Sequence, residues 1–505
     1  MSHGSNTTYN RLMKWFLTNT VLAGIFALLW LLLRSGTKPN RLAYPCQQAA
    51  FTTASLAFGA PIVAALITVR NVALRALGSR RALAIAGVGL FATVGLWGFL
   101  ASSGATTTSR RSLLQPPADY RATLYHVTNC PQEPRGDRFL GLDNLLELMG
   151  REGLKFYLSP TADSLSGPDG LIGSDDLIVI KINYQWTGIG GTNTDLLRGL
   201  IRSIVDHPDG FTGEVVVGEN TQFVSSENFD RSGNNAQDSS LSPRDVVDGF
   251  RAQGWQVSIS DWSQMSDFEA DEHLPCDESR GYVVQWSNPA GRVSYPRFTT
   301  IDGSCVSLKE GIWLPGTGSY DRDRLKVINL PVLKPHGYVY GVTAAVKHYM
   351  GVVTNGLNTG AHFGVANGLM GAVMAELGPP DLNILDCIWV QGNPFAGPGV
   401  GSFNASRLDQ LVASTDPIAL DIWAVKNILV PEFLANVYTT PWPRPCADPD
   451  DPDITFRNYL DNSMDALLAQ GYRVTNDLDS IDVHRWNGVP APRRVTGTRR
   501  LRVGG

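Results

Sequence analysis

Three long stretches without a charged residue, all near the N-terminus, restrict what this chain can fold into more than any other feature. Residues 15–33, 49–69 and 82–103 are each at least 19 residues long and strongly apolar. About 20 apolar residues in a helix cross the roughly 30 Å hydrocarbon core of a bilayer. A cleaved signal peptide would explain only the first stretch, and a helix in a soluble core is rarely apolar on every face. The sequence therefore predicts three transmembrane helices, a membrane anchor over residues 1–103, and the lipid bilayer as a partner.

The basic residues around these stretches indicate the orientation of the chain. Three spans place the N-terminus and the rest of the chain on opposite sides of the membrane. The short loop between the second and third stretches carries Arg70, Arg75, Arg80 and Arg81, the densest basic group. Basic loops tend to stay in the cytoplasm. The counts on the two sides are nearly balanced, so they favour an extracytoplasmic large domain by a small margin only.

The remainder of the chain divides into a linker, a large domain and a tail. Residues 104–125 contain the Thr, Arg and Pro residues typical of a linker. Residues 126–485 alternate short apolar runs with helical patterns, which predicts an α/β domain. Residues 486–505 form a basic tail, and such tails are usually disordered.

The order of the apolar runs predicts a largely parallel sheet with flanking helices. The β-rich run 176–182 has the composition of a strand buried on both faces. It is followed by an amphipathic helix at 194–205, with Thr194 as its expected N-cap, and by a strand at 214–218. These segments make a βαβ unit. We also predict an insertion at about 221–314, in which residues 281–314 have the pattern of antiparallel strands.

Charge and cysteine spacing exclude some classes of function. The net charge is only −5, so no strong field indicates a nucleic acid partner. None of the six cysteines lies in a C-x-x-C pair, so an iron–sulfur cluster is not expected and the cofactor stays unknown. In an exported domain Cys276 and Cys305 would be the most plausible disulfide. The alternative is that both are free thiols.

Lysine is scarce in this chain, with 9 lysines against 33 arginines, so lysines at strand ends are informative. Lys334 and His336 follow an apolar strand, and Lys347 begins a second Lys-His pair on the next helix. Ligands of parallel α/β folds bind beyond the carboxyl ends of strands. We therefore predict Lys334, His336 and Lys347 as catalytic residues, with His336 the first candidate for a metal ligand. The alternative is that they are exposed loop residues.

Five other residues are predicted to contact a substrate. Lys181 and Asn183 end the first buried strand, and His348 follows Lys347. Asp386 is expected to end a later strand, and Asp421 lies in an apolar helical pattern where it needs a partner. Either aspartate could orient a lysine or histidine, bind a metal ion, or form a structural ion pair. The glycine-rich loop at 187–193 lacks the spacing of a nucleotide-binding loop, so a turn is the better interpretation.

These segments together resemble the domain-of-unknown-function family 362. The match consists of Lys181-Ile182-Asn183, Val217-Gly218-Glu219, Lys334-Pro335-His336, Lys347-His348 with Gly351, Asp386, and the segment Ser414 to Asp421. They stand in the family's order over roughly residues 170–430. The sequence departs from the family pattern at His348, where asparagine is usual, and at Glu219, where aspartate is usual. The resemblance implies an α/β fold, and the family has no settled activity.

Two functions remain open from the sequence alone. The first is an enzyme that grips a small anionic molecule with lysines and uses histidine for acid–base or metal-assisted chemistry. It predicts that these side chains converge in one cleft with at least one carboxylate. The second is a non-catalytic binding or scaffold protein on a membrane, for which the lysines would scatter or lie in ion pairs. The sequence identifies no protein partner.

Overall fold

The computed structural model describes residues 114–487, apart from 131–135, 189, 222–228, 287, 337–340, 355, 358–360, 393–396, 399–404, 437–444, 446 and 452–453. The three predicted transmembrane segments and the tail beyond residue 487 lie outside the described residues. Within the described part of the chain, no helix combines the length and the apolar character that crossing a bilayer requires.

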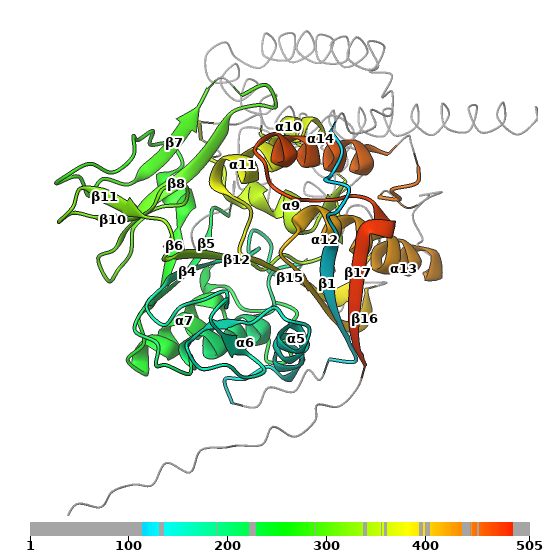
Figure 1. Cartoon of the computed structure of the whole chain (residues 1–505), viewed down its shortest axis with the longest axis horizontal. Helices are drawn as coiled ribbons and strands as arrows, with labels where there is room; N and C mark the ends of the chain where they lie inside the picture. Colours follow the sequence, from blue (N-terminus) through cyan, green and yellow to red (C-terminus); the bar gives the residue numbers. More distant parts are fainter. Residues whose placement is uncertain are drawn as a thin grey trace, which may run out of the picture. The chain divides into compact units, whose positions relative to one another are not determined.

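Runs of β-branched residues form the centre of an eight-stranded sheet with the order β17-β1-β16-β15-β12-β4-β5-β6 (Figure 1). Its five neighbouring parallel strands are β4 Leu177–Lys181, β5 Glu214–Glu219, β6 Val257–Asp261, β12 Leu325–Asn329 and β15 Leu382–Val390. β16 (Ser406–Ser414) runs antiparallel to both β15 and β1 (Ala122–Thr128), and β17 (Ile481–Asn487) runs parallel to β1. The predicted α/β fold with a largely parallel sheet is therefore confirmed.

Helices cover both faces of this sheet, which is why its central strands are apolar on both sides (Figure 1). Ile178 and Ile180 of β4 pack in one core, and Leu177 and Val179 pack in the other. The first core contains residues of α5 Leu140–Arg151, α6 Thr194–Val205 and α7 Pro243–Ala252. The second contains residues of α9 Ala345–His348, α11 Leu369–Leu377, α12 Pro417–Ala424 and α14 Thr455–Ala469.

A second, five-stranded sheet is antiparallel throughout, as the sequence predicts for the insertion. Its order is β11-β10-β9-β8-β7, with β7 Gly281–Gln285, β8 Val293–Thr299, β9 Cys305–Ser307, β10 Gly311–Leu314 and β11 Ser319–Asp321. Buried side chains of this sheet, such as Tyr282 and Val306, belong to the same core as α9 and α12. Cys276 and Cys305 are both free thiols, so no disulfide bond joins them.

Several boundaries differ from the sequence-based expectation. β1 begins at Ala122, inside the predicted linker, because residues of β1 pair with both β16 and β17. β6 lies within the predicted insertion but joins the main sheet beside β5. Asn193, not Thr194, caps α6, because its side chain accepts the N–H groups of Asp195 and Leu196.

The predicted helices near residues 344–353 and 417–429 are also interrupted. After α9 the chain forms a 3-10 turn at Tyr349–Gly351. After α12 it forms a π-helical turn at Val425–Leu429 that leads into α13 (Val430–Ala435). The apolar pattern continues through these changes of helix type, so the sequence shows one helix where the backbone makes several.

A substitution at Gly218 of β5 can test how closely Trp262 of the insertion packs against the main sheet. The fully buried Trp262 ring lies against it, and a Cβ on Gly218 would come within 3.0 Å of several atoms of that ring. We expect Gly218→Ala to lower the free energy of unfolding by about 1–3 kcal/mol through overpacking. Urea denaturation monitored by tryptophan fluorescence measures this.

Gly249 on α7 provides the control for this substitution. A Cβ there meets no atom within 4 Å. Gly249→Ala should therefore be neutral or stabilising by up to about 1 kcal/mol, since alanine favours a helix. Equal effects of the two substitutions would contradict the close packing of Trp262 on β5.

Candidate functional site

The carboxyl ends of β4, β5 and β12 bring Lys181, Glu219 and Asn329 to one edge of the sheet. Lys181 is the register partner of both Gly218 on β5 and Asn329 on β12, so Glu219 extends one residue beyond this row. All three polar side chains are buried. In parallel sheets this edge is where ligands bind.

The ammonium group of Lys181 uses all of its N–H groups in hydrogen bonds within the protein. Its ammonium group donates to the Ile182 carbonyl at 2.7 Å, to Glu219 Oε2, and to His348 Nε2 at 3.2 Å. A lysine ammonium has three N–H groups, and all three are used here. Burial lowers the pKa of Lys181 and raises that of Glu219 to about 6, although the two charges attract. Lys181 therefore belongs to a buried structural ion pair.

The proton on His348 can be placed from its neighbours. Asn329 Nδ2 donates to the Ala345 carbonyl at 3.0 Å, so the amide oxygen of Asn329 faces His348 Nδ1 at 2.6 Å. Nδ1 must then carry the proton, and Nε2 accepts from Lys181. Burial and the nearby lysines lower the pKa of His348 well below its usual range. The structure thus places His348 as a neutral support for Lys181, with both ring nitrogens in use.

Lys334 is held by neutral acceptors. Its ammonium donates to Asn183 Oδ1 at 2.8 Å and to the Gly190 carbonyl at 3.0 Å, which leaves one N–H group. Gly190 has a φ of +84°, and a Cβ there would lie 2.8 Å from Lys334 Cδ. The glycine-rich loop is therefore required for geometry, as the sequence indicates. Burial lowers the pKa of Lys334 to about 8, although Glu219 favours its charged form.

Lys347, on the short helix α9, is the least satisfied of these lysines. Its side chain is 2% exposed, and among the described residues it has neither a hydrogen bond nor an ion pair. Burial, followed by the charge of Lys334, lowers the pKa of Lys347 to about 7. Burying an amine without a hydrogen-bond partner costs free energy.

Two histidines complete a basic cluster around Lys347. The half-buried rings of His336 and His362 lie stacked, with centroids 6.1 Å apart. Burial and the charge of Lys347 lower the pKa of His336 well below its usual range and that of His362 to about 3. We name Lys334, His336, Lys347 and His362 the basic cluster. His362 lies on the short helix α10 (Ala361–Gly364), and the sequence pattern does not single it out.

Asp421 supports the backbone instead of a side chain of the cluster. Its two carboxylate oxygens accept the backbone N–H groups of Ala345 at 2.7 Å and Val346 at 3.0 Å. It therefore holds the first turn of α9, the helix that carries Lys347. Burial raises the pKa of Asp421 to about 8.

Asp386 does not join the basic cluster. The prediction that it ends a strand is wrong, because β15 continues through apolar residues to Val390. Its carboxylate accepts the Ile388 N–H at 2.9 Å, and burial raises its pKa to about 7. Within the described residues it forms no hydrogen bond or ion pair with a lysine.

The ligand sets that metal ions require are not found in the part of the chain that the structure describes. No group of three or more His, Cys, Asp or Glu side chains is arranged there to hold a metal ion. His336, the first metal candidate, has His362 as its ring neighbour and Thr343 Oγ1 at 3.4 Å from its Nδ1.

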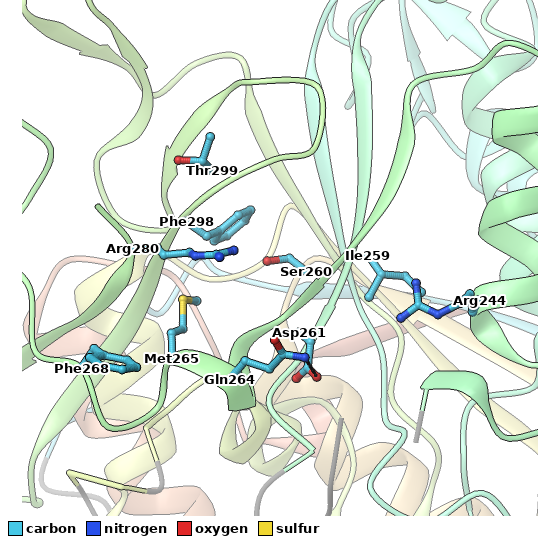
Figure 2. Close-up of a pocket in the computed structure, with 10 residues that line it drawn as sticks. All are labelled: Arg244, Ile259, Ser260, Asp261, Gln264, Met265, Phe268, Arg280, Phe298 and Thr299. Atoms are coloured by element: carbon cyan, nitrogen blue, oxygen red, sulfur yellow. Dashed lines mark hydrogen bonds between the residues drawn. The ribbon is translucent and has the colours of Figure 1, made fainter. Parts of the chain in front are cut away.

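A pocket of about 520 Å³ lies at the edge strand β6 (Figure 2). Figure 2 shows Ser260 of β6 pointing toward Arg280 and Phe298, whereas Ile259 lies beside Arg244. The other lining residues are Arg244, Gln264, Met265, Phe268, Arg280, Phe298 and Thr299. None of the predicted site residues lines this pocket, so it is distinct from the basic cluster.

Comparison with known proteins identifies one part of the chain. Residues 322–426 match the family model DUF362, a domain of unknown function. This segment contains the whole basic cluster together with His348, Asp386 and Asp421, whereas Lys181, Asn183 and Glu219 lie before it. No curated protein and no solved structure gives a significant match.

The pKa of Lys347 predicts a specific pH dependence of stability. The unfolded chain keeps the ordinary value of 10.5 and the folded chain has about 7. Between these values the unfolded state binds a proton that the folded state lacks, so stability rises with pH in this window. We expect the free energy of unfolding of the wild type, relative to Lys347→Met, to rise by up to about 1.4 kcal/mol per pH unit between about pH 7 and pH 10. Denaturation of both proteins in Tris buffers without multivalent anions measures the difference, and a constant difference would contradict the prediction.

Proposed function

We propose that this chain, which belongs to the DUF362 family through residues 322–426, binds a small anionic molecule between Lys334 and Lys347 and holds this site on a membrane-anchored domain. The observation that carries the proposal is the buried amine of Lys347, which has no partner among the described residues. An anion beside it would supply the missing counter-charge and the missing hydrogen bonds.

The neighbours of Lys347 fit the same ligand. Lys334 retains one N–H group after donating to Asn183 and Gly190. Neither Lys334 nor Lys347 forms an ion pair with a described carboxylate, so a bound anion would meet no resident competitor there. His336 and His362 are half-buried, whereas Lys347 is buried, which makes the histidine side the natural approach for a small molecule.

The cluster is also suited to moving protons. General acid–base catalysis works best when the pKa of the catalytic group lies near the operating pH. The pKa values of Lys347 and Lys334, about 7 and about 8, meet this condition. These features favour an enzyme over a scaffold protein, for which the lysines would be scattered or ion-paired. Of Lys181, Lys334 and Lys347, only Lys181 is ion-paired with a described carboxylate.

Anion binding can be tested by thermal unfolding with inorganic phosphate and with oxalate as probes. A ligand at about 100 times its Kd stabilises a protein by about 2.7 kcal/mol. We expect a concentration-dependent rise in Tm for the wild type, because the anion neutralises Lys347, and loss of this rise in Lys347→Met. Lys334→Met should weaken the response, since it removes the second cation.

Lys326→Met serves as the matched control. Lys326 lies on β12, and its charge acts on Asp176 and Asp381, which are not part of the basic cluster. This variant should keep the full response to both anions. An unchanged response in Lys347→Met would show that the anion binds elsewhere and would overturn the proposal.

The membrane anchor is proposed from residues 15–33, 49–69 and 82–103. We expect the full chain to stay in the membrane fraction after alkaline carbonate extraction, because three apolar spans resist release. Release by carbonate would contradict the anchor.

The orientation of the anchored domain can be measured on Cys276, an exposed free thiol. A membrane-impermeant maleimide should label it in intact cells if the domain is extracytoplasmic, with Cys276→Ser as the control. Labelling only after permeabilisation would reverse the orientation.

A further inference from the structure

Lys347 combines the features that make a lysine nucleophilic. Burial and a neighbouring cation both favour the neutral amine, whose lone pair can attack a carbonyl carbon. Lys347 is buried, and the neighbouring cation whose charge acts on it is Lys334. No described residue donates or accepts a hydrogen bond at its Nζ atom, so the described part of the protein leaves this lone pair unengaged.

The backbone that carries this amine is also held in place. Asp421 holds the first turn of α9 through the backbone N–H groups of Ala345 and Val346, which directly precede Lys347. Glu219, the carboxylate whose charge acts on Lys334, is tied to Lys181. The fold therefore fixes the helix that carries Lys347 without giving this lysine a described carboxylate that would hold it in the protonated form.

We propose that Lys347 forms a Schiff base with a small 2-oxo acid whose carboxylate is bound by the remaining N–H group of Lys334. This inference rests on the proposed anion site and assigns its ligand class. A carboxylate next to a carbonyl places the anionic group and the electrophilic carbon one bond apart, which suits two neighbouring amines, one charged and one neutral. A charge-assisted hydrogen bond from Lys334 would orient the acid.

The chemistry balances without an external oxidant or reductant. The lone pair of Lys347 Nζ adds to the carbonyl carbon, and the carbonyl oxygen takes up a proton while nitrogen loses one, which gives a carbinolamine. The hydroxyl group then leaves as water after a second protonation, and nitrogen loses its remaining proton, so that amine and ketone become imine and water. The protons taken up and released in these steps exchange with water, because the lowered pKa values of His336 and His362 keep both imidazoles neutral.

The test is reductive trapping of the full-length protein with pyruvate and cyanoborohydride, followed by peptide mass analysis. We expect a saturable label on Lys347 whose rate rises as the pH passes through about 7, and not near the ordinary lysine value, because of its lowered pKa. Lys334→Met should reduce the labelling rate about tenfold or more, since a hydrogen bond to a charged group contributes about 1.5–3 kcal/mol. Lys326→Met should be labelled like the wild type.

Protection by a competing anion makes the test independent of any variant that fails to fold. Oxalate and phosphate, which would occupy the anion site but have no reactive ketone, should protect Lys347 in the wild type and leave surface lysines unprotected. Labelling spread over surface lysines, or no label on Lys347, would overturn the Schiff base. If oxalate still raises the Tm through Lys347 in that case, anion binding survives. If neither response depends on Lys347, both proposals fail.

Discussion

The buried ion pair of Lys181 and Glu219 is the interaction on which the layout above the sheet depends. Two opposite charges that are buried away from water must lie in close contact to offset the loss of hydration. Removing one partner of such a pair is strongly destabilising. The pair uses the ends of two adjacent parallel strands, and Gly351 leaves room for it, because a Cβ there would come within 3.0 Å of both charged groups. Through His348 and Asn329 the same network anchors α9 over the sheet.

Lysines that lie close together thus take opposite roles because of what surrounds them. Lys181 donates three hydrogen bonds and faces a carboxylate, whereas Lys347 has no described partner and feels the charge of another cation. Lys334 is intermediate, with two neutral acceptors. A stable fold gains nothing from an unsatisfied buried amine, so its presence in a well-packed core is the physical reason to look for a ligand there.

The carboxylates show why burial alone does not mark a catalytic group. Asp421 and Asp386 are both buried and both have raised pKa values, yet their described carboxylate oxygens accept from backbone N–H groups. Asp421 acts on the basic cluster through the position of α9. The family match begins only at residue 322. The ion pair of Lys181 and Glu219, which underlies this segment, is therefore formed by strands outside the match.

The sequence by itself determined the α/β class and the central strands, because the apolar runs of strands buried on both faces are visible in the order of residues. It also singled out Lys334, His336 and Lys347 as candidate site residues, because lysine is scarce in this chain. Only the tertiary structure decided which lysine is satisfied. Hydrogen bonds such as Lys181 to Glu219 and Lys334 to Asn183 join residues 38 and 151 positions apart, and no local pattern contains such distances. His362 escapes sequence-based prediction for the same reason: it approaches His336 through the fold, and its own neighbours in the chain carry no charge.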